Sequence, residues 1–314
     1  MTLASTTDTS FSLDIKKSKY SPNQCVLSND EHGVWLYQAN CIEFMDALIE
    51  KYPLGMFDMI FADPPYFLSN GGITCQAGKM VKVDKGQWDQ SQGAELNHEF
   101  NRSWLSRCQK LLNPNGTLWV SGTHHVIHSV GYAMQQLGMK ILNDIVWEKP
   151  NPPPNLSCRY FTHSTETIIW AAKNEKSKHC FQYNRMKAIN ANKQMKSVWI
   201  FTDSDSDSDS EEKPEEPTME RRWTYTAPSG AEKALGKHPT QKPFRVLERI
   251  ISASTEEKDW IFDPFAGSAT TGVAAVALGR RFVGCELEED FISLAKKRLD
   301  AAILKKASPP GDQP

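Results

Sequence analysis

The stretch FDMIFADPPY, residues 57–66, begins as a mostly apolar segment and ends in an acidic, proline-rich and aromatic turn. Continuous apolar runs of this kind are typical of parallel strands that are buried on both faces. In a doubly wound sheet, ligands bind beyond the carboxyl ends of the strands, where Asp63, Pro64, Pro65 and Tyr66 would lie. A surface proline turn explains four residues equally well, so the rest of the chain must decide.

A second turn of the same kind lies near the C-terminal end. DPFAGSATTG (263–272) follows an apolar strand and precedes a helical segment. Small residues in such a turn let a ligand approach the backbone and the helix N-terminus. Glu286 ends the next strand, where an acidic residue of a nucleotide-binding unit can accept both ribose hydroxyls. The alternatives are a turn that is small for packing alone and a solvated surface carboxylate.

Strands and helices alternate on both sides of these turns, which indicates an α/β domain with a mainly parallel sheet. The strands are expected within 34–40, 57–66, 113–122, 139–150, 165–173, 259–267 and 280–290. The helices are expected at 41–52, 98–112, 129–138, 243–254, 270–279 and 290–306.

The alternation breaks at about residue 174 and resumes at 236, which predicts one α/β domain with an insertion. Long loops in compact proteins are usually functional or mobile, and 67–93 has little periodicity. The predicted parts are a flexible tail 1–24, a catalytic half 25–173 with the mobile loop 67–93, a target-recognition insertion 174–235 with a disordered acidic segment 203–217, a cofactor half 236–306 and a disordered tail 307–314.

The net charge of −2 seems at first to argue against a nucleic-acid partner. Residues 203–217, DSDSDSDSEEKPEEP, contain four Asp, four Glu and one Lys and therefore carry −7. The remaining chain has 35 basic and 30 acidic residues, a charge of +5. A mildly basic body keeps a polyanion as an expected partner.

The chain shows no sign of export or of a membrane partner. Its first residues lack a basic start followed by an apolar core, and no apolar run is long enough to span a bilayer. The seven cysteines are scattered without a CxxC pair, which favours free thiols in a reducing compartment over disulfides or a zinc site. We therefore expect a cytoplasmic protein with no structural metal.

The two turns together resemble the amino-methyltransferases of DNA. DPPY precedes DPFAGSATT by about two hundred residues with a variable region between them, which is the order of the β class. GKHPTQKP (236–243) and FTHSTETIIWA (161–171) match the family as well, and the segments 59–73 and 151–170 look closest to its DpnA-like branch, which acts in restriction–modification systems recognising GATC. The resemblance implies a circularly permuted, Rossmann-like, doubly wound sheet whose catalytic half comes first.

The resemblance implies a site-specific DNA methyltransferase that uses S-adenosylmethionine to methylate N6 of a flipped adenine. Asp63 and the carbonyl of Pro64 would accept the two N6 hydrogen bonds, which localises the nitrogen lone pair and positions it. Tyr66 would stack on the extruded base, and Pro65 would stiffen the turn.

The same resemblance places the cofactor along the second half of the sheet. Thr240 and Lys242 would approach its methionine carboxylate, where a lysine point charge suits the ligand. Glu286 would bind its ribose. The full expected set is Asn40, Asp63, Thr240, Lys242, Asp263, Phe265, Gly267, Ser268, Thr270 and Glu286.

Two positions depart from the family pattern. Family members usually have Gly-Asp before the first helix, where this chain has Ala39-Asn40, although the Asn40 carbonyl can still accept from the cofactor's adenine amine. Family members also usually have a second glycine in the cofactor turn, where this chain has Ala269. We expect its extra methyl group to tighten the pocket and weaken cofactor binding.

Phosphate contacts need Lys or Arg, and base readout needs side chains that reach the groove edges. A homodimer and single-stranded DNA both stay open beside double-stranded DNA. The DNA-binding candidates are Lys79, Lys82, Lys85 and Trp88 in the loop, Arg159 and Tyr160 after the PNPPP turn, and Arg185, Lys187, Lys193, Lys196, Arg221 and Arg222 in the insertion. Each alone could equally be a solvated surface charge.

Two alternatives remain at this point. One is methylation of cytosine N4, which also begins from an exocyclic amine, although Asp at the first motif position favours adenine by resemblance. The other is a catalytically silent DNA-binding partner subunit that kept the fold. The intact DPPY argues against it, while Asn40 and Ala269 leave it open.

Overall fold

The computed structural model describes residues 11, 23–69, 73–76, 79–82, 89–149, 152, 154–155, 157–200, 235–236 and 241–307. The acidic segment 203–217 and the C-terminal residues 308–314 lie outside this part of the chain, as do residues 1–22 apart from Phe11. None of the helices in the described residues has both the length and the apolar character needed to cross a bilayer.

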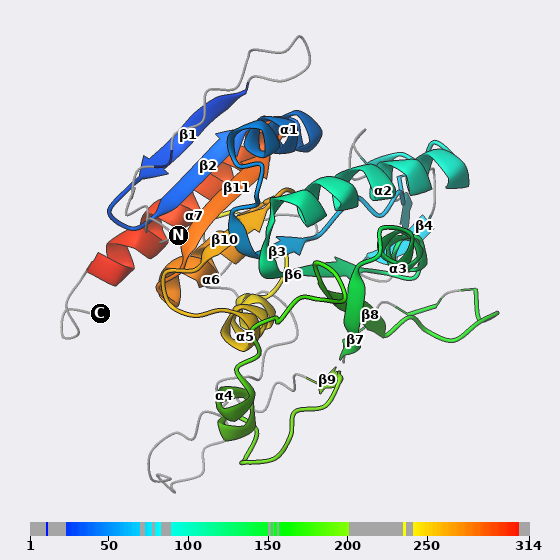
Figure 1. Ribbon diagram of the computed structural model, residues 1–314. Coiled ribbons are helices and arrows are strands. Elements are labelled where there is room, and N and C mark those ends of the chain that lie inside the picture. The colour runs from blue at the N-terminus through cyan, green and yellow to red at the C-terminus, as the bar shows by residue number, and fades with distance from the viewer. Residues whose placement is uncertain are drawn as a thin grey trace, which may run out of the picture.

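The chain builds one large sheet and a separate two-stranded sheet. The strands of the large sheet are β1 (Gln24–Asn29), β2 (Val34–Gln38), β3 (Phe57–Ala62), β6 (Leu112–Gly122), β7 (Lys140–Glu148), β8 (Thr165–Ala172), β9 (Val198–Ile200), β10 (Trp260–Asp263) and β11 (Arg281–Glu286). Their order is β1-β2-β11-β10-β3-β6-β8-β7-β9 (Figure 1).

Five central strands, β2, β11, β10, β3 and β6, run parallel to one another. Strand β8 runs antiparallel to both of its neighbours, and β1 runs antiparallel to β2. Strand β10 comes late in the chain but pairs with β3 at the centre of the sheet, so the two halves of the chain meet there. The predicted doubly wound, mainly parallel α/β fold is confirmed.

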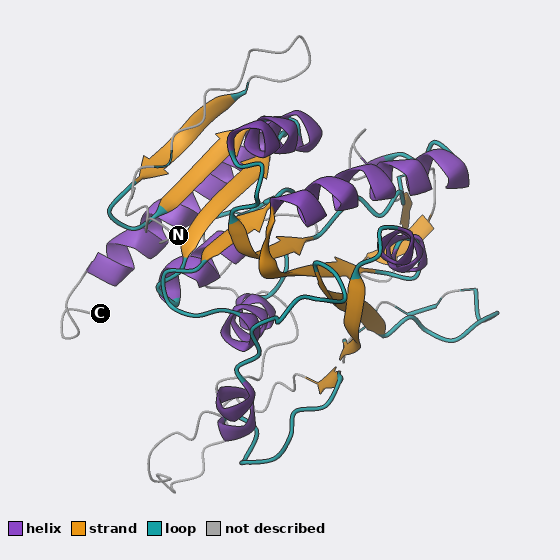
Figure 2. Cartoon of the chain, in the orientation of Figure 1, coloured by secondary structure: helices purple, strands orange, loops and turns teal. Residues whose placement is uncertain are grey.

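Helices cover both faces of the sheet (Figures 1 and 2). They are α1 (Cys41–Lys51), α2 (Ala94–Leu111), α3 (Ile127–Gln136), α5 (Phe244–Ser254), α6 (Thr270–Ala277) and α7 (Glu289–Ala307), while the short α4 (Tyr183–Ala188) packs against α5. Helices α1, α2 and α3 share one buried apolar cluster, and α5, α6 and α7 share the other.

Alternation along the strands creates these two clusters. In β2, Trp35 and Tyr37 belong to the first cluster, whereas Val34 and Leu36 belong to the second. Successive side chains of a strand point to opposite faces, so a strand covered on both sides must be apolar at every position. The continuous apolar runs seen in the sequence are therefore the signature of this three-layer arrangement.

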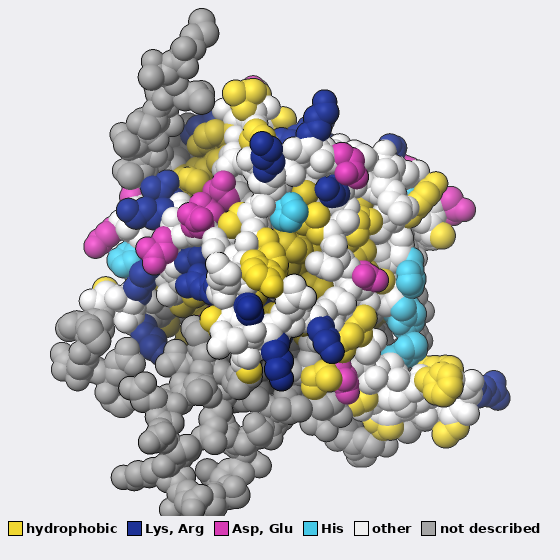
Figure 3. Space-filling view, turned by 60° about the horizontal axis from the view of Figure 1, so that its bottom comes forward, with side chains coloured by type: hydrophobic (Ala, Val, Ile, Leu, Met, Phe, Trp, Pro, Cys, Tyr) yellow, Lys and Arg dark blue, Asp and Glu magenta, His cyan; other side chains and the backbone are white. Residues whose placement is uncertain are grey.

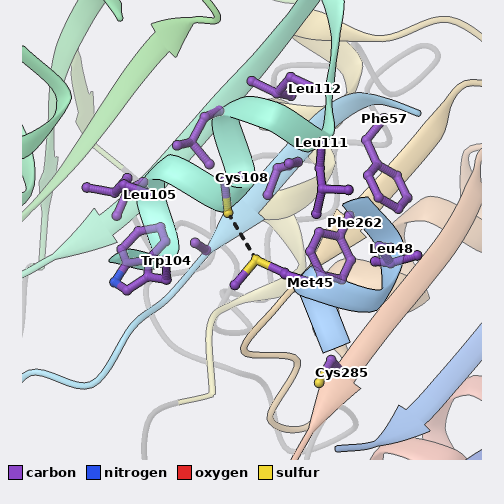
Figure 4. Packing of buried hydrophobic residues seen from close by; sticks show 14 of the residues in the cluster. Met45, Leu48, Phe57, Trp104, Leu105, Cys108, Leu111, Leu112, Phe262 and Cys285 are labelled. Atoms are coloured by element: carbon purple, nitrogen blue, oxygen red, sulfur yellow. Dashed lines mark hydrogen bonds between the residues drawn. The ribbon is translucent and has the colours of Figure 1, made fainter. Parts of the chain in front are cut away.

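The first cluster packs α1 and α2 against the middle of the sheet (Figure 4). Met45 of α1 faces Cys108 of α2, whose thiol lies 3.7 Å from the Met45 sulfur, and Leu48 lies beside Phe262. Phe262 of β10 belongs to the same cluster, and its ring stacks on that of Phe57 with 4.9 Å between the ring centroids. Burial of side chains of this size contributes about 1.5–3 kcal/mol each, which fixes the two helices over the strands that carry the turns.

The structure differs from expectation at several places, among them β1 and α4, which the sequence did not predict. The stretch 67–93 contains an antiparallel pair of strands, β4 (Ile73–Gln76) and β5 (Lys79–Lys82). They were not predicted because the sequence there has no clear alternation of apolar and polar residues. Strand β9, from within 174–235, pairs with β7, so this region adds a strand to the sheet. Phe11, in the stretch expected to be a tail, is buried against Trp35 and Trp260 because its ring fills an aromatic cluster.

Candidate functional site

The two Asp-Pro turns lie side by side at the carboxyl edge of the sheet. Ile60 of β3 pairs with Phe262 of β10, and both strands then continue into a turn that begins with aspartate. A cavity of about 310 Å³ opens between these turns, within the range of about 300–1,000 Å³ found for small-molecule sites. The predicted residues that line it are Asn40, Asp63, Pro64, Pro65, Tyr66, Lys242, Asp263, Phe265, Gly267, Ser268, Thr270 and Glu286.

Asp63 uses both carboxylate oxygens. Its Oδ1 accepts from the Tyr66 hydroxyl at 2.6 Å, and its Oδ2 accepts from Lys242 Nζ at 2.5 Å. Burial raises the pKa of Asp63 and the nearby Glu166 raises it further, while Lys242 opposes both effects. The expected catalytic carboxylate therefore lies on the cavity wall in a charged network.

Tyr66 is almost completely buried, and its hydroxyl lies between two carboxylates. The oxygen is 2.6 Å from Asp63 Oδ1 and 2.7 Å from Glu166 Oε1. Burial and the two carboxylates raise the pKa of Tyr66 well above its ordinary value, so the phenol keeps its proton. One hydroxyl proton can serve only one of the two carboxylates at a time.

Glu166, on β8, joins this network although the sequence analysis did not select it. Its Oε1 accepts from Ser121 at 2.8 Å and faces Lys242 at 3.1 Å, while its Oε2 pairs with Lys149. Burial alone would raise the pKa of Glu166, but Lys242 and Lys149 outweigh it and hold that pKa well below its usual range. One signal was available, because a carboxylate inside the apolar strand TETIIWAA is costly to bury without a partner.

Lys242 lies deep beside the catalytic turn. Only 8% of the residue is exposed, and its ammonium group contacts Asp63, Glu166 and the Tyr66 hydroxyl. Burial tends to lower its pKa, but Asp63 and Glu166 outweigh that effect and raise it. The structure thus gives this lysine a partner in the catalytic turn, and its expected contact with a methionine carboxylate stays a prediction.

Asp89 anchors the catalytic turn from a distance. Its carboxylate accepts from the backbone amides of Tyr66, Phe67 and Leu68 at 2.7–3.1 Å, and from the Ser69 hydroxyl at 3.0 Å. Asp89 is completely buried. No feature of the sequence around it marked it out, because its partners lie 20 to 23 residues earlier and belong to a turn without a repeat.

The cofactor turn is held mainly by its own residues. Asp263 Oδ1 accepts from the Phe265 amide at 3.0 Å, and Oδ2 accepts from the Thr271 hydroxyl at 2.6 Å. Burial raises the pKa of Asp263 to about 7 against these two hydrogen bonds. This aspartate closes the turn at the start of α6.

Glu286 and Arg298 hold the cofactor turn from outside. The Gly267 amide donates to Glu286 Oε2 at 2.8 Å, and the amides of Leu287 and Glu288 donate to Oε1 at 2.8 and 2.9 Å. Burial raises the pKa of Glu286, and these amides oppose the rise. Arg298 of α7 donates to Ser268 and Thr270, so both polar residues are fixed where they line the cavity.

The two departures from the family pattern have local structural explanations. Asn40 is the N-cap of α1, and its Oδ1 accepts from the amides of Ile42 and Glu43. Ala269 has φ +55°, a left-handed conformation that glycine adopts more easily. Ala269 is fully buried within the apolar cluster of α5, α6 and α7 and is absent from the cavity lining, so the expectation that its methyl group tightens the pocket is wrong.

The DNA-binding candidates fall into three groups. Those of α4 and the segment after it are Arg185, Lys187, Lys193 and Lys196, and all but the half-buried Lys187 are exposed. Arg159 and Tyr160 are exposed on the connection between β7 and β8, beside the almost fully exposed Phe161. The rings of His124 and His163 stack at 4.2 Å next to Tyr160, and Figure 3 shows a row of histidines along one edge of the molecule. Of the other candidates, Lys79 and Lys82 belong to β5, whose side chains are not described, and Lys85, Trp88, Arg221 and Arg222 lie outside the described residues together with Thr240.

Comparison with known sequences gives consistent results. The N6/N4 methyltransferase family model, described as DNA methylase, matches residues 57–297. The chain is 54% identical over 245 residues to Type II methyltransferase M2.DpnII of Streptococcus pneumoniae, covering 78% of this chain and 82% of that protein. It is 52% identical to M2.LlaDCHI of Lactococcus lactis subsp. cremoris, with 81% and 86% covered, and 45% identical to M2.MboI of Moraxella bovis, with 86% and 89% covered.

Solved structures share the fold. The M1.HpyAVI–SAM complex aligns with a TM-score of 0.57 and 27% identity, covering 85% of this chain and 99% of that one. The PvuII cytosine-N4-specific DNA methyltransferase aligns with a TM-score of 0.58 over 87% of this chain and 92% of that one. Its identity of 17% supports a common fold alone.

Proposed function

This chain belongs to the DNA methylase family of N6 and N4 methyltransferases, and from that premise we propose that it methylates the N6 amine of adenine in GATC as the modification arm of a restriction–modification system. Membership of the family makes it a DNA methyltransferase that depends on S-adenosylmethionine. The choice of adenine and of the GATC site rests on the DPPY motif and on the DpnA-like segments of the sequence.

One observation carries the proposal. Asp63 lines a cavity that the small-residue turn beginning at Asp263 also lines. The acceptor for the amine and the turn that would bind the methyl donor therefore line the same cavity. Catalysis of this kind depends on position and electrostatics, so the juxtaposition is what the reaction needs.

In the proposed reaction Asp63 accepts one N6 hydrogen bond and the Pro64 carbonyl accepts the other. Two fixed acceptors concentrate the lone pair on nitrogen, which is otherwise delocalised into the adenine ring. Tyr66 lines the cavity and offers its ring to the extruded base, which offsets part of the lost stacking. As nitrogen bonds to the methyl carbon, the carbon–sulfur bond would break and leave a neutral thioether. The hydrogen-bonded Asp63 carboxylate would take the extra proton from nitrogen, which becomes a neutral secondary amine.

The residues of the second turn fit the cofactor chemically. S-adenosylmethionine supplies an electrophilic methyl group on a positively charged sulfur. The buried carboxyl of Asp263 and the half-buried carboxylate of Glu286 suit a ligand with a positive centre and ribose hydroxyls, and the side chain of Phe265 offers an apolar surface. The turn at Gly267 lets the ligand come close to the backbone. We assign Asn40, Ser268, Thr270, Thr240 and Lys242 to the same site, as the sequence predicts.

The proposal extends to the substrate and the assembly. Double-stranded DNA is the expected substrate, with single-stranded DNA as the alternative, and the protein acts in the cytoplasm where that DNA lies. The segment 174–235 is assigned to target recognition, and a homodimer is the expected assembly. The exposed pair Arg159 and Tyr160 is assigned to the DNA.

The test incubates the purified chain with methyl-labelled S-adenosylmethionine and unmethylated duplexes that contain GATC or the rearranged sequence GTAC. Digestion to nucleosides should show N6-methyladenine from the GATC duplex alone. Label in N4-methylcytosine would overturn the choice of adenine, and label in both duplexes would overturn the choice of site. Absence of label would remove the assignment as an active enzyme. Asp63→Ala should transfer no methyl group while still binding the cofactor.

A further inference from the structure

Four charged side chains and the Tyr66 hydroxyl form a network around the catalytic turn, and of the four only Lys149 is substantially exposed. Asp63 and Glu166 supply two carboxylates, Lys242 and Lys149 supply two ammonium groups, and the Tyr66 hydroxyl bridges the carboxylates. Glu166 is only 3% exposed and Lys242 only 8%. Charges at this depth are stable only while they stay paired, so the network must remain paired when the substrate arrives.

The network as it stands competes with the proposed reaction for Asp63. Oδ2 of Asp63 accepts from Lys242, and Oδ1 accepts from Tyr66 whenever the single hydroxyl proton is not turned to Glu166. The adenine amine must donate to one of the same oxygens, so it competes with these two donors. If Lys242 left Asp63 and found no other acceptor, a buried ammonium group would lose part of its charge pairing. That loss is strongly unfavourable.

We propose that Glu166 is a positioning residue that takes over the Tyr66 hydroxyl and the Lys242 ammonium when the target amine engages Asp63. This inference rests on the proposed function. The exchange needs little movement, since Glu166 Oε1 already lies 2.7 Å from the Tyr66 oxygen and 3.1 Å from Lys242 Nζ. The tyrosine proton needs only to turn from one carboxylate to the other.

The supports of Glu166 suit it to stay in place while the others shift. It lies on β8 between β6 and β7, and Ser121 of β6 donates to Oε1 at 2.8 Å. Lys149 follows β7 and pairs with Oε2, and its backbone amide is bonded to the Ser164 carbonyl at 2.7 Å. Tyr66 and Lys242 instead lie outside the strands, and only the Tyr66 hydroxyl proton and the Lys242 ammonium need to shift, while Asp89 holds the Tyr66 backbone.

The charge of Glu166 matters as well as its shape. A glutamine at this position keeps an oxygen that can accept from Tyr66, but it cannot balance the Lys242 ammonium. Lys242 then stays on Asp63 and competes with the adenine amine. The negative charge of Glu166 also raises the pKa of Asp63, so the charge affects the ionisation of the carboxylate that must accept the amine.

Glu166→Gln, Glu166→Asp and a matched control, Glu148→Gln, are compared with the wild-type chain in methyl transfer at saturating cofactor. Glu148 is on the neighbouring strand and outside the network, so its variant should keep kcat within about twofold. Glu166→Gln should lower kcat by about 100-fold and leave both KM values nearly unchanged. The acid limb of its pH profile of kcat should move to lower pH, because the negative charge of Glu166, which raises the pKa of Asp63, is gone. Glu166→Asp, which keeps the charge, should restore the wild-type limb and part of kcat.

The outcomes separate the inference from the proposed function. A wild-type chain that does not methylate adenine refutes the function. An active wild-type chain whose Glu166→Gln variant keeps the wild-type kcat and pH profile refutes the positioning role alone. If Glu166→Gln does not fold, Glu166→Asp decides, because a wild-type acid limb with a reduced kcat supports the role. The positioning role is overturned if the acid limb of the Glu166→Asp profile is displaced, or if the kcat of this variant is unchanged.

Discussion

The catalytic turn at Asp63 and the cofactor turn at Asp263 begin alike and are stabilised differently. Each follows one of two paired parallel strands and starts with Asp-Pro. The Asp63 carboxylate binds the Tyr66 hydroxyl of its own turn and the distant Lys242 ammonium, whereas the Asp263 carboxylate binds only an amide and a hydroxyl of its own turn. The first aspartate is therefore available for exchange with a substrate, and the second maintains a backbone shape.

The strongest test of this difference exchanges each aspartate for its amide. Asp63→Asn should lower kcat by about 10³-fold with an unchanged Kd for the cofactor, because the acceptor for the amine is weakened in the reaction alone. Asp263→Asn should mainly raise the Kd for the cofactor. Single-turnover kinetics and calorimetric titration measure the two effects. Equal losses of kcat in both variants would show that the turns do not differ in role.

The distant anchor of the catalytic turn offers a second test. Asp89→Ala leaves three backbone amides and the Ser69 hydroxyl without their acceptor, so it should lower the free energy of unfolding by about 3 kcal/mol. Chemical denaturation measures the loss. Ser69→Ala, which removes one hydroxyl and leaves the amides bonded, is the matched control and should cost about 1 kcal/mol. Similar losses in both variants would mean that Asp89 is no anchor.

The buried carboxyl of the cofactor turn should make stability depend on pH. Burial raises the pKa of Asp263 from 3.8 to about 7, so between these values the folded chain holds a proton that the unfolded chain has released. This contribution is complete below pH 3.8 and is lost as the pH rises through 7. Relative to Asp263→Asn, the wild-type chain should lose up to about 1.4 kcal/mol per pH unit across that window. A constant difference between pH 4.5 and 7 would contradict the assignment.

The smallest effect is expected at the left-handed alanine of the cofactor turn. Ala269→Gly relieves a positive φ, but it removes a buried methyl group and adds chain entropy to the unfolded state. These effects oppose one another, so the free energy of unfolding should change by less than about 1 kcal/mol. The Kd for the cofactor should stay the same, because the methyl group is turned towards the core. A tighter cofactor complex in the glycine variant would restore the idea of a constricted pocket.

The sequence supported much of the fold because each strand covered on both faces is apolar at nearly every position. The runs ending at Ala62 and Asp263 marked strands that the structure places at the centre of the sheet. The hairpin β4–β5 and the sheet strand β9 were missed because both are short and carry little periodicity. Short strands are chosen by the partner that they pair with, and that partner is not visible in the local sequence.

The sequence alone determined the two turns, their order along the chain and the family to which they point, because each turn is a local pattern that follows an apolar run. Only the tertiary structure decided the pKa of Asp63 and most of the partners of its carboxylate. Its partner Lys242 lies 179 positions away, and Tyr66 meets Glu166 across 100 positions. Such contacts arise from strand order and helix packing, and the depth of burial then sets the pKa of each group. A buried network of this kind is a property of the folded chain, which no single stretch of sequence contains.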